Sequence, residues 1–151
     1  MNPLLARIIG TVGYVGHFPV APGTLASAVG VGLAFSLRNY SLWYVLVTAV
    51  ITVVGIVAAG IVEKQEGKKD PGCVVIDEVA GMMVSLFGIP LSWPAMLVGF
   101  FLFRAFDMFK IYPANKLEAM GGGFGIVADD IAAGIYANLT LQIALRLAGW
   151  M

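Results

Sequence analysis

The sequence predicts an all-α fold, a compact helical membrane bundle of about four to five helices, and two observations carry this prediction. First, 60% of the 151 residues are hydrophobic and only 12% are charged, whereas soluble domains are roughly 45–50% apolar and about 25% charged. Second, the charges cluster, and some of the uncharged runs between them exceed the roughly 20 residues that cross a bilayer. We expect one domain, residues 1–151.

The helices are expected in the uncharged runs, taken in order along the chain. Residues 25–37 form a short apolar helix after a Pro- and Gly-rich loop at 13–24. Residues 41–62 and residues 79–103 are uncharged runs of 22 and 25 residues, and each is long enough to cross a membrane. Residues 131–145, extendable through Arg146 to Trp150, form the last helix. Buried helices of a soluble protein would explain the shorter runs but not residues 41–62.

Residues 79–103 contain helix breakers near their middle. Gly88, Pro90 and Pro94 predict a short re-entrant hairpin, and a single kinked span is the alternative. A hairpin places seven of the nine Lys and Arg residues on one side of the membrane, with only Arg38 and Arg146 opposite. The positive-inside rule then predicts that the side with seven cations faces the cytoplasm.

Charge and residue counts exclude several classes of function. The formal net charge is +0, so there is no basic field to hold a nucleic-acid backbone. The single cysteine, Cys73, excludes an intrachain disulfide framework and a Cys-rich zinc site, and it lacks the arginine of a Cys-x5-Arg phosphatase. The single histidine, His17, has three candidate roles: a general acid, a hydrogen-bond donor to a phosphate, or a hydrogen-bonding surface residue.

Carboxylates gather at the ends of the apolar runs, at Asp77, Glu78, Asp107, Asp129 and Asp130. Acidic residues at a helix N-terminus interact favourably with the helix dipole, which is one explanation. The other is a site, because ionisable groups at membrane depth are costly and usually functional. Carboxylate oxygens suit a hard cation such as Mg²⁺ or Mn²⁺. We predict metal ligands at Asp77, Glu78, Asp129 and Asp130.

Three residues are candidates for binding phosphate. Arg104, Asp107 and Lys110 recur at a spacing of three and share one arc of a helix, as a phosphate clamp or as a solvated ladder of ion pairs. Thr24 is expected to cap the helix after the Pro–Gly break, where free backbone N–H groups bind anions, unless the loop is only a rigid turn. The candidate phosphate-binding residues are therefore Thr24, Arg104 and Lys110.

Small residues before and within the last helix have structural explanations as well as functional ones. The glycines of residues 121–125 either let the backbone approach a ligand or form a flexible connector. Asp130, Gly134, Asn138 and Gln142 align at steps of four residues. We expect this stripe to face the interior of the bundle and to hold the helices together.

Four motifs, in this order, resemble the phosphatidylglycerophosphatase A family over nearly the whole chain. They are PVAPGT at 19–24, IDE at 76–78 with Gly81, FRAFDMFK at 103–110, and GGFGIVADD at 122–130 with Ala133 and Gly134. The resemblance implies a small, mostly helical, Mg²⁺-dependent phosphatase. It implies removal of the terminal phosphate of phosphatidylglycerophosphate to give phosphatidylglycerol. It also implies a multi-pass protein of the bacterial cytoplasmic membrane, with its site facing the cytoplasm and lipids as its partners.

The candidate catalytic carboxylates are Asp77, Asp107 and Asp130. Water is the expected nucleophile, activated by the metal or by a carboxylate such as Asp77 or Asp130, and an aspartyl-phosphate intermediate is the alternative. A CDP-alcohol phosphotransferase would need an Asp-Gly-x-x-Ala-Arg run, which this sequence lacks. A small membrane carrier or channel that uses the carboxylates as a cation path remains the rival outside the enzymes, and phosphate release from a lipid separates the two.

Overall fold

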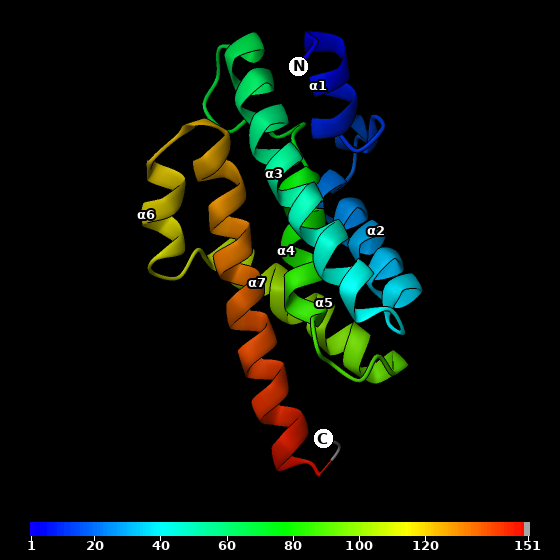
Figure 1. The fold of residues 1–151 in the computed structure, drawn as a ribbon. Coiled ribbons are helices and arrows are strands. Elements are labelled where there is room, and N and C mark those ends of the chain that lie inside the picture. The colour runs from blue at the N-terminus through cyan, green and yellow to red at the C-terminus, as the bar shows by residue number, and fades with distance from the viewer. Residues whose placement is uncertain (150–151) are drawn as a thin grey trace.

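The computed structural model describes residues 1–149, and over that range the chain is all-helical (Figure 1). The all-α prediction is confirmed. Seven α-helices lie in the described range, more than the four to five expected, because two short helices, α1 and α6, form where none was predicted. Trp150, the predicted end of the last helix, lies outside the described residues. The elements are α1 (Pro3–Gly10), the 3₁₀ turn η1 (Val15–His17), α2 (Pro22–Leu37), α3 (Ser41–Glu66), α4 (Ile76–Leu86), α5 (Trp93–Phe109), α6 (Ala114–Ala119) and α7 (Gly122–Leu147).

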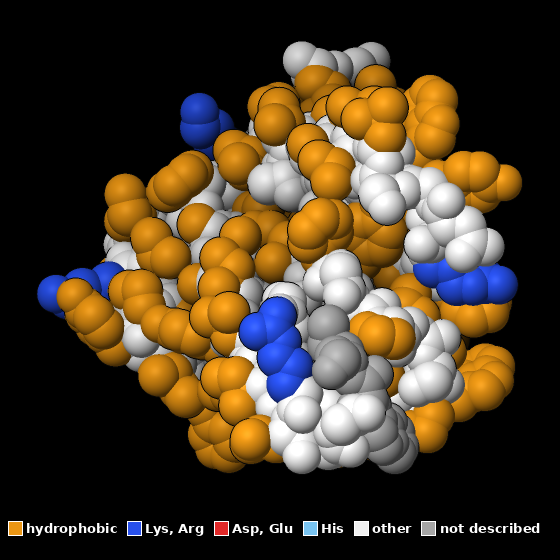
Figure 2. All heavy atoms as spheres, turned by 60° about the horizontal axis from the view of Figure 1, so that its bottom comes forward, with side chains coloured by type: hydrophobic (Ala, Val, Ile, Leu, Met, Phe, Trp, Pro, Cys, Tyr) orange, Lys and Arg blue, Asp and Glu red, His pale blue; other side chains and the backbone are white. Residues whose placement is uncertain are grey.

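Within residues 1–149, two helices are long and apolar enough to cross a membrane. They are α3, with a mean hydropathy of 2.8, and α7, with a mean hydropathy of 1.2. Large apolar side chains of α3, among them Leu42, Trp43 and Val53, are exposed. The face seen in Figure 2 is mostly hydrophobic, with isolated Lys or Arg side chains and no acidic side chain in view among the residues described. This exposed apolar surface, together with two helices of membrane-spanning length, indicates a membrane protein.

The chain doubles back between α4 and α5, as the helix breakers predict. Helix α4 ends at Leu86, and α5 begins at Trp93 after Ser92, whose Oγ accepts a hydrogen bond from the Ala95 N–H. As a result the start of α4 and the end of α5 lie at the same end of the bundle, where Glu78 Oε1 is 3.8 Å from Arg104 Nη1. The turn therefore brings the first two charged segments of the chain together.

Two helices begin earlier than the sequence predicted. Helix α2 begins at Pro22 after Ala21, which has a φ of 47° and caps the helix without a side-chain hydrogen bond, so the predicted Thr24 cap was wrong. Helix α7 begins at Gly122, not near residue 131, so residues 122–125 are helical rather than a loop. Asp129 and Asp130 therefore lie two turns inside α7, beyond the first turn in which the helix dipole acts, and the dipole explanation fails for this pair.

The early start of α7 follows from close packing against α3. A Cβ on Gly123 would collide with the carbonyl oxygen of Ile56, and a Cβ on Gly60 would lie 3.2 Å from the Gly123 nitrogen. Small residues at such a crossing let two membrane helices approach closely. These glycines thus pack helices together, which neither of the two sequence-based explanations included.

We expect Gly123→Ala to destabilise the protein by roughly 1–3 kcal/mol, the usual cost of overpacking, because its Cβ would meet backbone that cannot move aside. Gly32→Ala is the matched control, since a Cβ there meets nothing within 4 Å and alanine favours the helix by roughly 0.8–1.0 kcal/mol. Thermal unfolding in detergent micelles measures both variants. A Gly123→Ala protein as stable as the Gly32→Ala protein would contradict the packing argument.

The polar stripe on α7 faces the bundle interior, as predicted. The Asn138 side-chain amide donates to the carbonyl oxygens of Ser85 at 3.0 Å and Phe87 at 2.8 Å. The Gln142 side chain donates to Asn138 Oδ1 at 2.7 Å. Gly134 has no room for a side chain, because a Cβ there would collide with the carbonyl oxygen of Gly81. These contacts thus hold α4 against α7, and they determine the position along α4 at which the Asp130 side chain lies.

Candidate functional site

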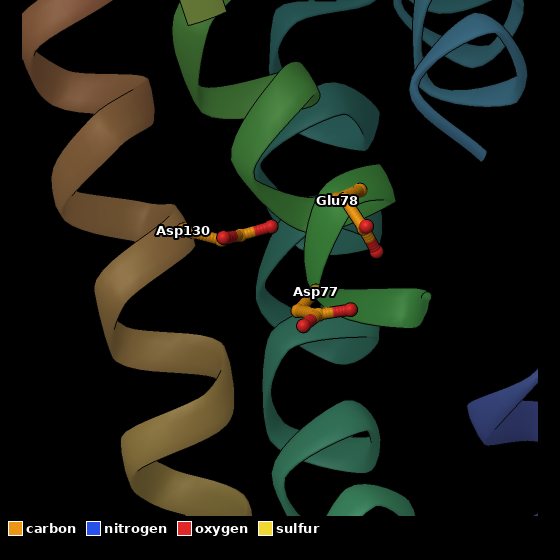
Figure 3. A group of neighbouring side chains, drawn as sticks. All are labelled: Asp77, Glu78 and Asp130. Atoms are coloured by element: carbon orange, nitrogen blue, oxygen red, sulfur yellow. The ribbon is translucent and has the colours of Figure 1, made fainter. Parts of the chain in front are cut away.

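Three carboxylates converge where α4 meets α7 (Figure 3). Asp77, Glu78 and Asp130 each place one carboxylate oxygen within 4.8 Å of the other two. Asp77 and Glu78 lie in the first turn of α4, whereas Asp130 points toward them from α7. Asp77 is 7% exposed and Asp130 is 4% exposed, so the group lies inside the protein.

One carboxylate oxygen of each of these three residues lacks a hydrogen-bond partner among the described residues. Asp77 Oδ1, Glu78 Oε2 and Asp130 Oδ2 are buried and unpartnered among the described residues. Burial raises the pKa of Asp77, and the charge of Glu78 raises it further. Burial also raises the pKa of Glu78, although a hydrogen bond to Asp77 and the charge of Arg104 act in the opposite direction. A hard divalent cation would satisfy these oxygens and offset their repulsion, so the residues present fit one.

Asp129, the fourth predicted ligand, is not brought into this group. Its Oδ2 accepts a hydrogen bond from Lys110 Nζ at 3.0 Å, and the same ammonium group lies 2.8 Å from Glu118 Oε1. Burial lowers the pKa of Lys110, but the hydrogen bonds and charges of Glu118 and Asp129 outweigh it and raise the pKa overall. Lys110 therefore ties the end of α5 to α6 and α7, and its assignment to phosphate stays a prediction.

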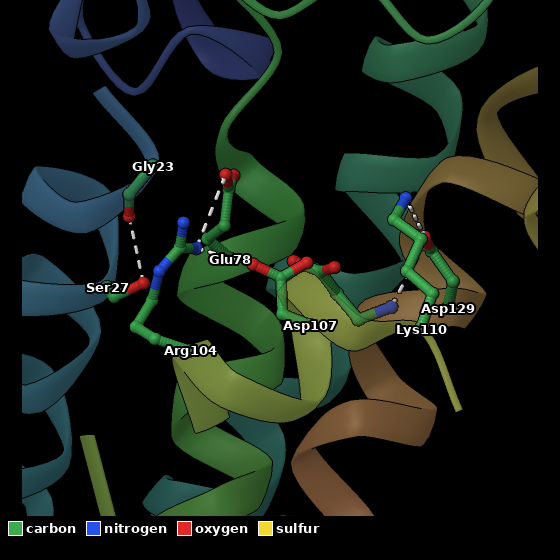
Figure 4. Close-up of polar contacts among 8 residues, drawn as sticks. Gly23, Ser27, Glu78, Arg104, Asp107, Lys110 and Asp129 are labelled. Atoms are coloured by element: carbon green, nitrogen blue, oxygen red, sulfur yellow. Dashed lines mark hydrogen bonds and ion pairs between the residues drawn. The ribbon is translucent and has the colours of Figure 1, made fainter. Parts of the chain in front are cut away.

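Arg104 lies beside Glu78, one of the three clustered carboxylates (Figure 4). Its Nη1 is 2.6 Å from Asp107 Oδ2 and 3.8 Å from Glu78 Oε1. Among the described residues only Nη1 contacts a carboxylate, which leaves the N–H groups of Nε and Nη2 for a ligand. The predicted ladder of ion pairs exists between Arg104 and Asp107 but does not continue to Lys110, which pairs with Asp129 instead.

The first turn of α2 forms another wall of the site. A Cβ on Gly23 would collide with Glu78 Oε1 and lie 3.3 Å from Arg104 Nη1. The buried Ser27 hydroxyl donates to the Gly23 carbonyl oxygen at 2.8 Å. The Thr24 N–H donates to the Ala21 carbonyl oxygen, so it is not free for an anion, and the Thr24 side chain remains the candidate group.

Several residues have positions that the sequence did not reveal. Gly23 and Ser27 lie in or beside the Pro–Gly–Thr motif, and a glycine in the first helical turn was the available signal. Glu118 and Asp70 had no predicted role, yet both lie near Lys110: burial raises the pKa of Asp70, and the charge of Lys110 partly offsets this. His17 is exposed, with its ring 5.6 Å from that of Tyr14, as expected of a surface residue.

A helical membrane protein whose buried carboxylates lie beside an arginine belongs to a class suited to phosphate-ester chemistry. Comparison with known families agrees, because the model of the family described as phosphatidylglycerophosphatase A matches residues 8–145. The chain therefore belongs to the phosphatidylglycerophosphatase A family, and it is a phosphatase. No solved structure matches it.

Three relatives show how the similarity is distributed. Phosphatidylglycerophosphatase A of Haemophilus influenzae is 33% identical over 100% of this chain and 92% of its own length. The Escherichia coli protein of the same name is 33% identical over 80% of this chain and 72% of its own. A Bacteroides thetaiotaomicron protein named "Putative phosphatidylinositol-3-phosphatase" is 35% identical over 96% of both chains. The names of the relatives thus differ in the lipid they specify.

Proposed function

We propose that this protein hydrolyses the terminal phosphomonoester of phosphatidylglycerophosphate, giving phosphatidylglycerol and phosphate, with Mg²⁺ held by Asp77, Glu78 and Asp130. The observation that carries the proposal is the convergence of three buried, unpartnered carboxylate oxygens beside Arg104. The substrate is supported by the two relatives named phosphatidylglycerophosphatase A. A cation path in a carrier is disfavoured, because the family is one of phosphatases.

Each residue has a distinct task in this proposal. Mg²⁺ bound by the three carboxylates would supply a Lewis acid that neutralises the charge of the phosphate. The Nε and Nη2 groups of Arg104 form a planar fork that matches two phosphate oxygens. Asp107 holds the other arm of that guanidinium at 2.6 Å and so orients the fork.

The reaction transfers the phosphoryl group to water. The water oxygen forms a bond to phosphorus as the bond from phosphorus to the glycerol oxygen breaks. The carboxylate of Asp77 or Asp130 accepts the proton of the attacking water, and the glycerol oxygen takes a proton from a solvent water as it leaves, which gives the free hydroxyl of phosphatidylglycerol. Arg104 contributes most as charge shifts in the transition state.

We place the site on the cytoplasmic side of a multi-pass membrane protein. The turn between α4 and α5 supports this, because it returns the chain toward α6, where the Ala119 carbonyl oxygen accepts a hydrogen bond from Lys69 in the charged segment that follows α3. Seven of the nine cations then lie on that side, which is the asymmetry that cytoplasmic loops show.

Phosphate release from purified protein in detergent micelles tests the function. We expect release from phosphatidylglycerophosphate with Mg²⁺, loss of release when EDTA removes the metal, and recovery when Mg²⁺ is added back. Phosphatidylinositol 3-phosphate at the same concentration tests the activity named for the Bacteroides relative, and we expect slower release from it. No release from either lipid would overturn the proposed reaction, and undiminished release in EDTA would overturn the role of the metal.

A further inference from the structure

Two stripes of side chains, one on α2 and one on α5, lead away from the candidate site. On α2, Thr24, Ala28, Val31 and Phe35 recur at steps of four, three and four residues and therefore share one helix face. On α5, the matching stripe runs in the opposite direction through Arg104, Phe100, Leu97 and Trp93. Each stripe covers 12 residues and extends about 16 Å along its helix. Both stripes begin at a candidate phosphate-binding residue and end at an aromatic ring.

A groove lies between these stripes. It is a cavity of about 240 Å³ lined by apolar side chains of α2 and α5, including Ala28, Val31 and Phe100, with the buried Met96 among them. Leu97 and Trp93 are 56% and 73% exposed, so the groove is open on the side that faces the surface. A hydrocarbon chain can therefore enter it sideways from the membrane.

A pair of stacked aromatic rings lies at the end of the groove away from Arg104. The rings of Phe35 and Trp93 stack with their centroids 6.2 Å apart. The Arg38 guanidinium lies over the Phe35 ring of this pair, 3.9 Å from the ring centroid. Cation–π contact and stacking hold such rings in place. Arg104 thus lies one helical turn beyond the groove residue Phe100, and the aromatic pair lies at the other end of the α5 stripe, about 16 Å from Arg104 along the helix.

We propose that this groove binds one acyl chain of the lipid substrate, with the phosphate at the Arg104 end and the chain extended toward the Phe35–Trp93 pair. The inference rests on the proposed function and adds to it a binding site for the apolar part of the substrate. Charge complementarity fixes the direction, because an anionic headgroup matches Arg104 and the apolar walls match only the chain.

A larger cavity fits this role less well. It has a volume of about 650 Å³ and lies between α3, α4 and α7, where Val53 and Ile135 are among its lining residues. Neither cavity has a charged side chain in its lining among the described residues. The α2–α5 groove differs because its lining residue Phe100 lies one helical turn from Arg104 on the same face of α5. The α2–α5 groove is the one whose stripes lead to Arg104.

A tryptophan in the groove tests the proposal. Ala28→Trp fills the groove, and Val29→Trp is the matched control, because Val29 neighbours Ala28 on α2, is 39% exposed and does not line the groove. Phosphate release is measured with dioleoyl and with dihexanoyl phosphatidylglycerophosphate, since hexanoyl chains have less apolar surface to bury in the groove than oleoyl chains. We expect Ala28→Trp to lower the ratio of long-chain to short-chain kcat/KM at least tenfold, and Val29→Trp to leave the ratio unchanged.

The outcomes separate this inference from the proposed function. If the wild-type protein hydrolyses neither lipid, the proposed function itself is wrong. A wild-type protein that hydrolyses both, together with an Ala28→Trp protein of unaltered ratio, overturns the groove alone. If Val53→Trp, which fills the larger cavity, lowers the ratio instead, the chain lies there. If Ala28→Trp changes the oligomeric state in detergent without changing the ratio, the groove holds a second copy of the chain and the inference fails.

The aromatic pair supplies a second, independent variant. Trp93→Ala removes one of its two rings, at an exposed position. We expect the chain length with the highest kcat/KM to move to longer chains in a series of saturated substrates. An unchanged optimum would show that the Phe35–Trp93 pair does not end the binding site.

Discussion

Replacing Asp77 or Asp130 by asparagine is expected to remove most of the turnover while making the metal-free protein more stable. Asparagine keeps the shape of the side chain but lacks the charge that a hard cation needs. A metal contributes several kcal/mol of transition-state stabilisation, and 1.36 kcal/mol is a factor of ten in rate, so we expect kcat/KM to fall roughly 10²–10³-fold. The stability rises because the substitution removes one of three mutually repelling carboxylates, each of which has one unpartnered oxygen.

Thermal unfolding with and without Mg²⁺ is the readout that separates this role from a structural one. Mg²⁺ that binds only the folded protein raises Tm, and we expect this increase in the wild type but not in Asp77→Asn or Asp130→Asn. Glu66→Gln is the control, because Glu66 pairs with Arg7 at the surface, where an ion pair contributes little. An Asp77→Asn protein that Mg²⁺ stabilises as much as the wild type would contradict the metal site.

Asp129→Asn distinguishes the structure from the sequence-based ligand set. In the structure its carboxylate binds Lys110, so the variant should lose part of a buried ion pair but keep the Mg²⁺-dependent rise in Tm. The two adjacent aspartates point differently because neighbours on a helix lie about 100° apart. The sequence did contain the signal, since Asp130, and not Asp129, aligns with the inward-facing stripe through Gly134 and Asn138.

The arrangement of the helices was more predictable than their first residues. Long uncharged runs and the breakers at Gly88, Pro90 and Pro94 are local features, and they suffice for the all-α class and for the turn between α4 and α5. The start of α7 depends instead on the contact of Gly123 with Ile56, a residue far away in sequence. Glycine is a poor helix former, so propensity predicts a loop where packing produces a helix.

The candidate site, like the fold, has features that local sequence predicts and features that depend on contacts between distant residues. Residue types and spacing identified the carboxylates and Arg104, because few charges occur in this chain and most of them lie at the ends of apolar runs. The carboxylate oxygens that come together depend on how each helix is rotated about its axis and on how far it is shifted along that axis. The packing contacts between α4 and α7 determine both. The role of Gly23 was missed for this reason, since its lack of a side chain matters only where Glu78 and Arg104 lie against α2.

Arg104→Ala is expected to lower both kcat and affinity, and Arg104→Lys to recover only part of the loss. The guanidinium remains charged at any working pH and offers Nε and Nη2 as a rigid fork, whereas lysine offers a single point charge. Losing one charge-assisted hydrogen bond costs roughly 1.5–3 kcal/mol, so kcat/KM of Arg104→Lys should fall about 10- to 150-fold. Arg104→Ala should fall further, because it also leaves Asp107 and Glu78 without their cation.

The effect on kcat decides between a phosphate clamp and a structural ion pair. A clamp acts most strongly in the transition state, so kcat falls together with affinity, while the Mg²⁺-dependent rise in Tm is kept because Arg104 is not a metal ligand. If Arg104 only pairs with Asp107 at the membrane surface, Asp107→Asn and Arg104→Ala should both leave turnover near that of the wild type. Near-normal phosphate release by Arg104→Ala in detergent micelles would rule out the clamp. A large loss in Arg104→Ala with a smaller one in Asp107→Asn would support it, because Asp107 then acts only by orienting the fork.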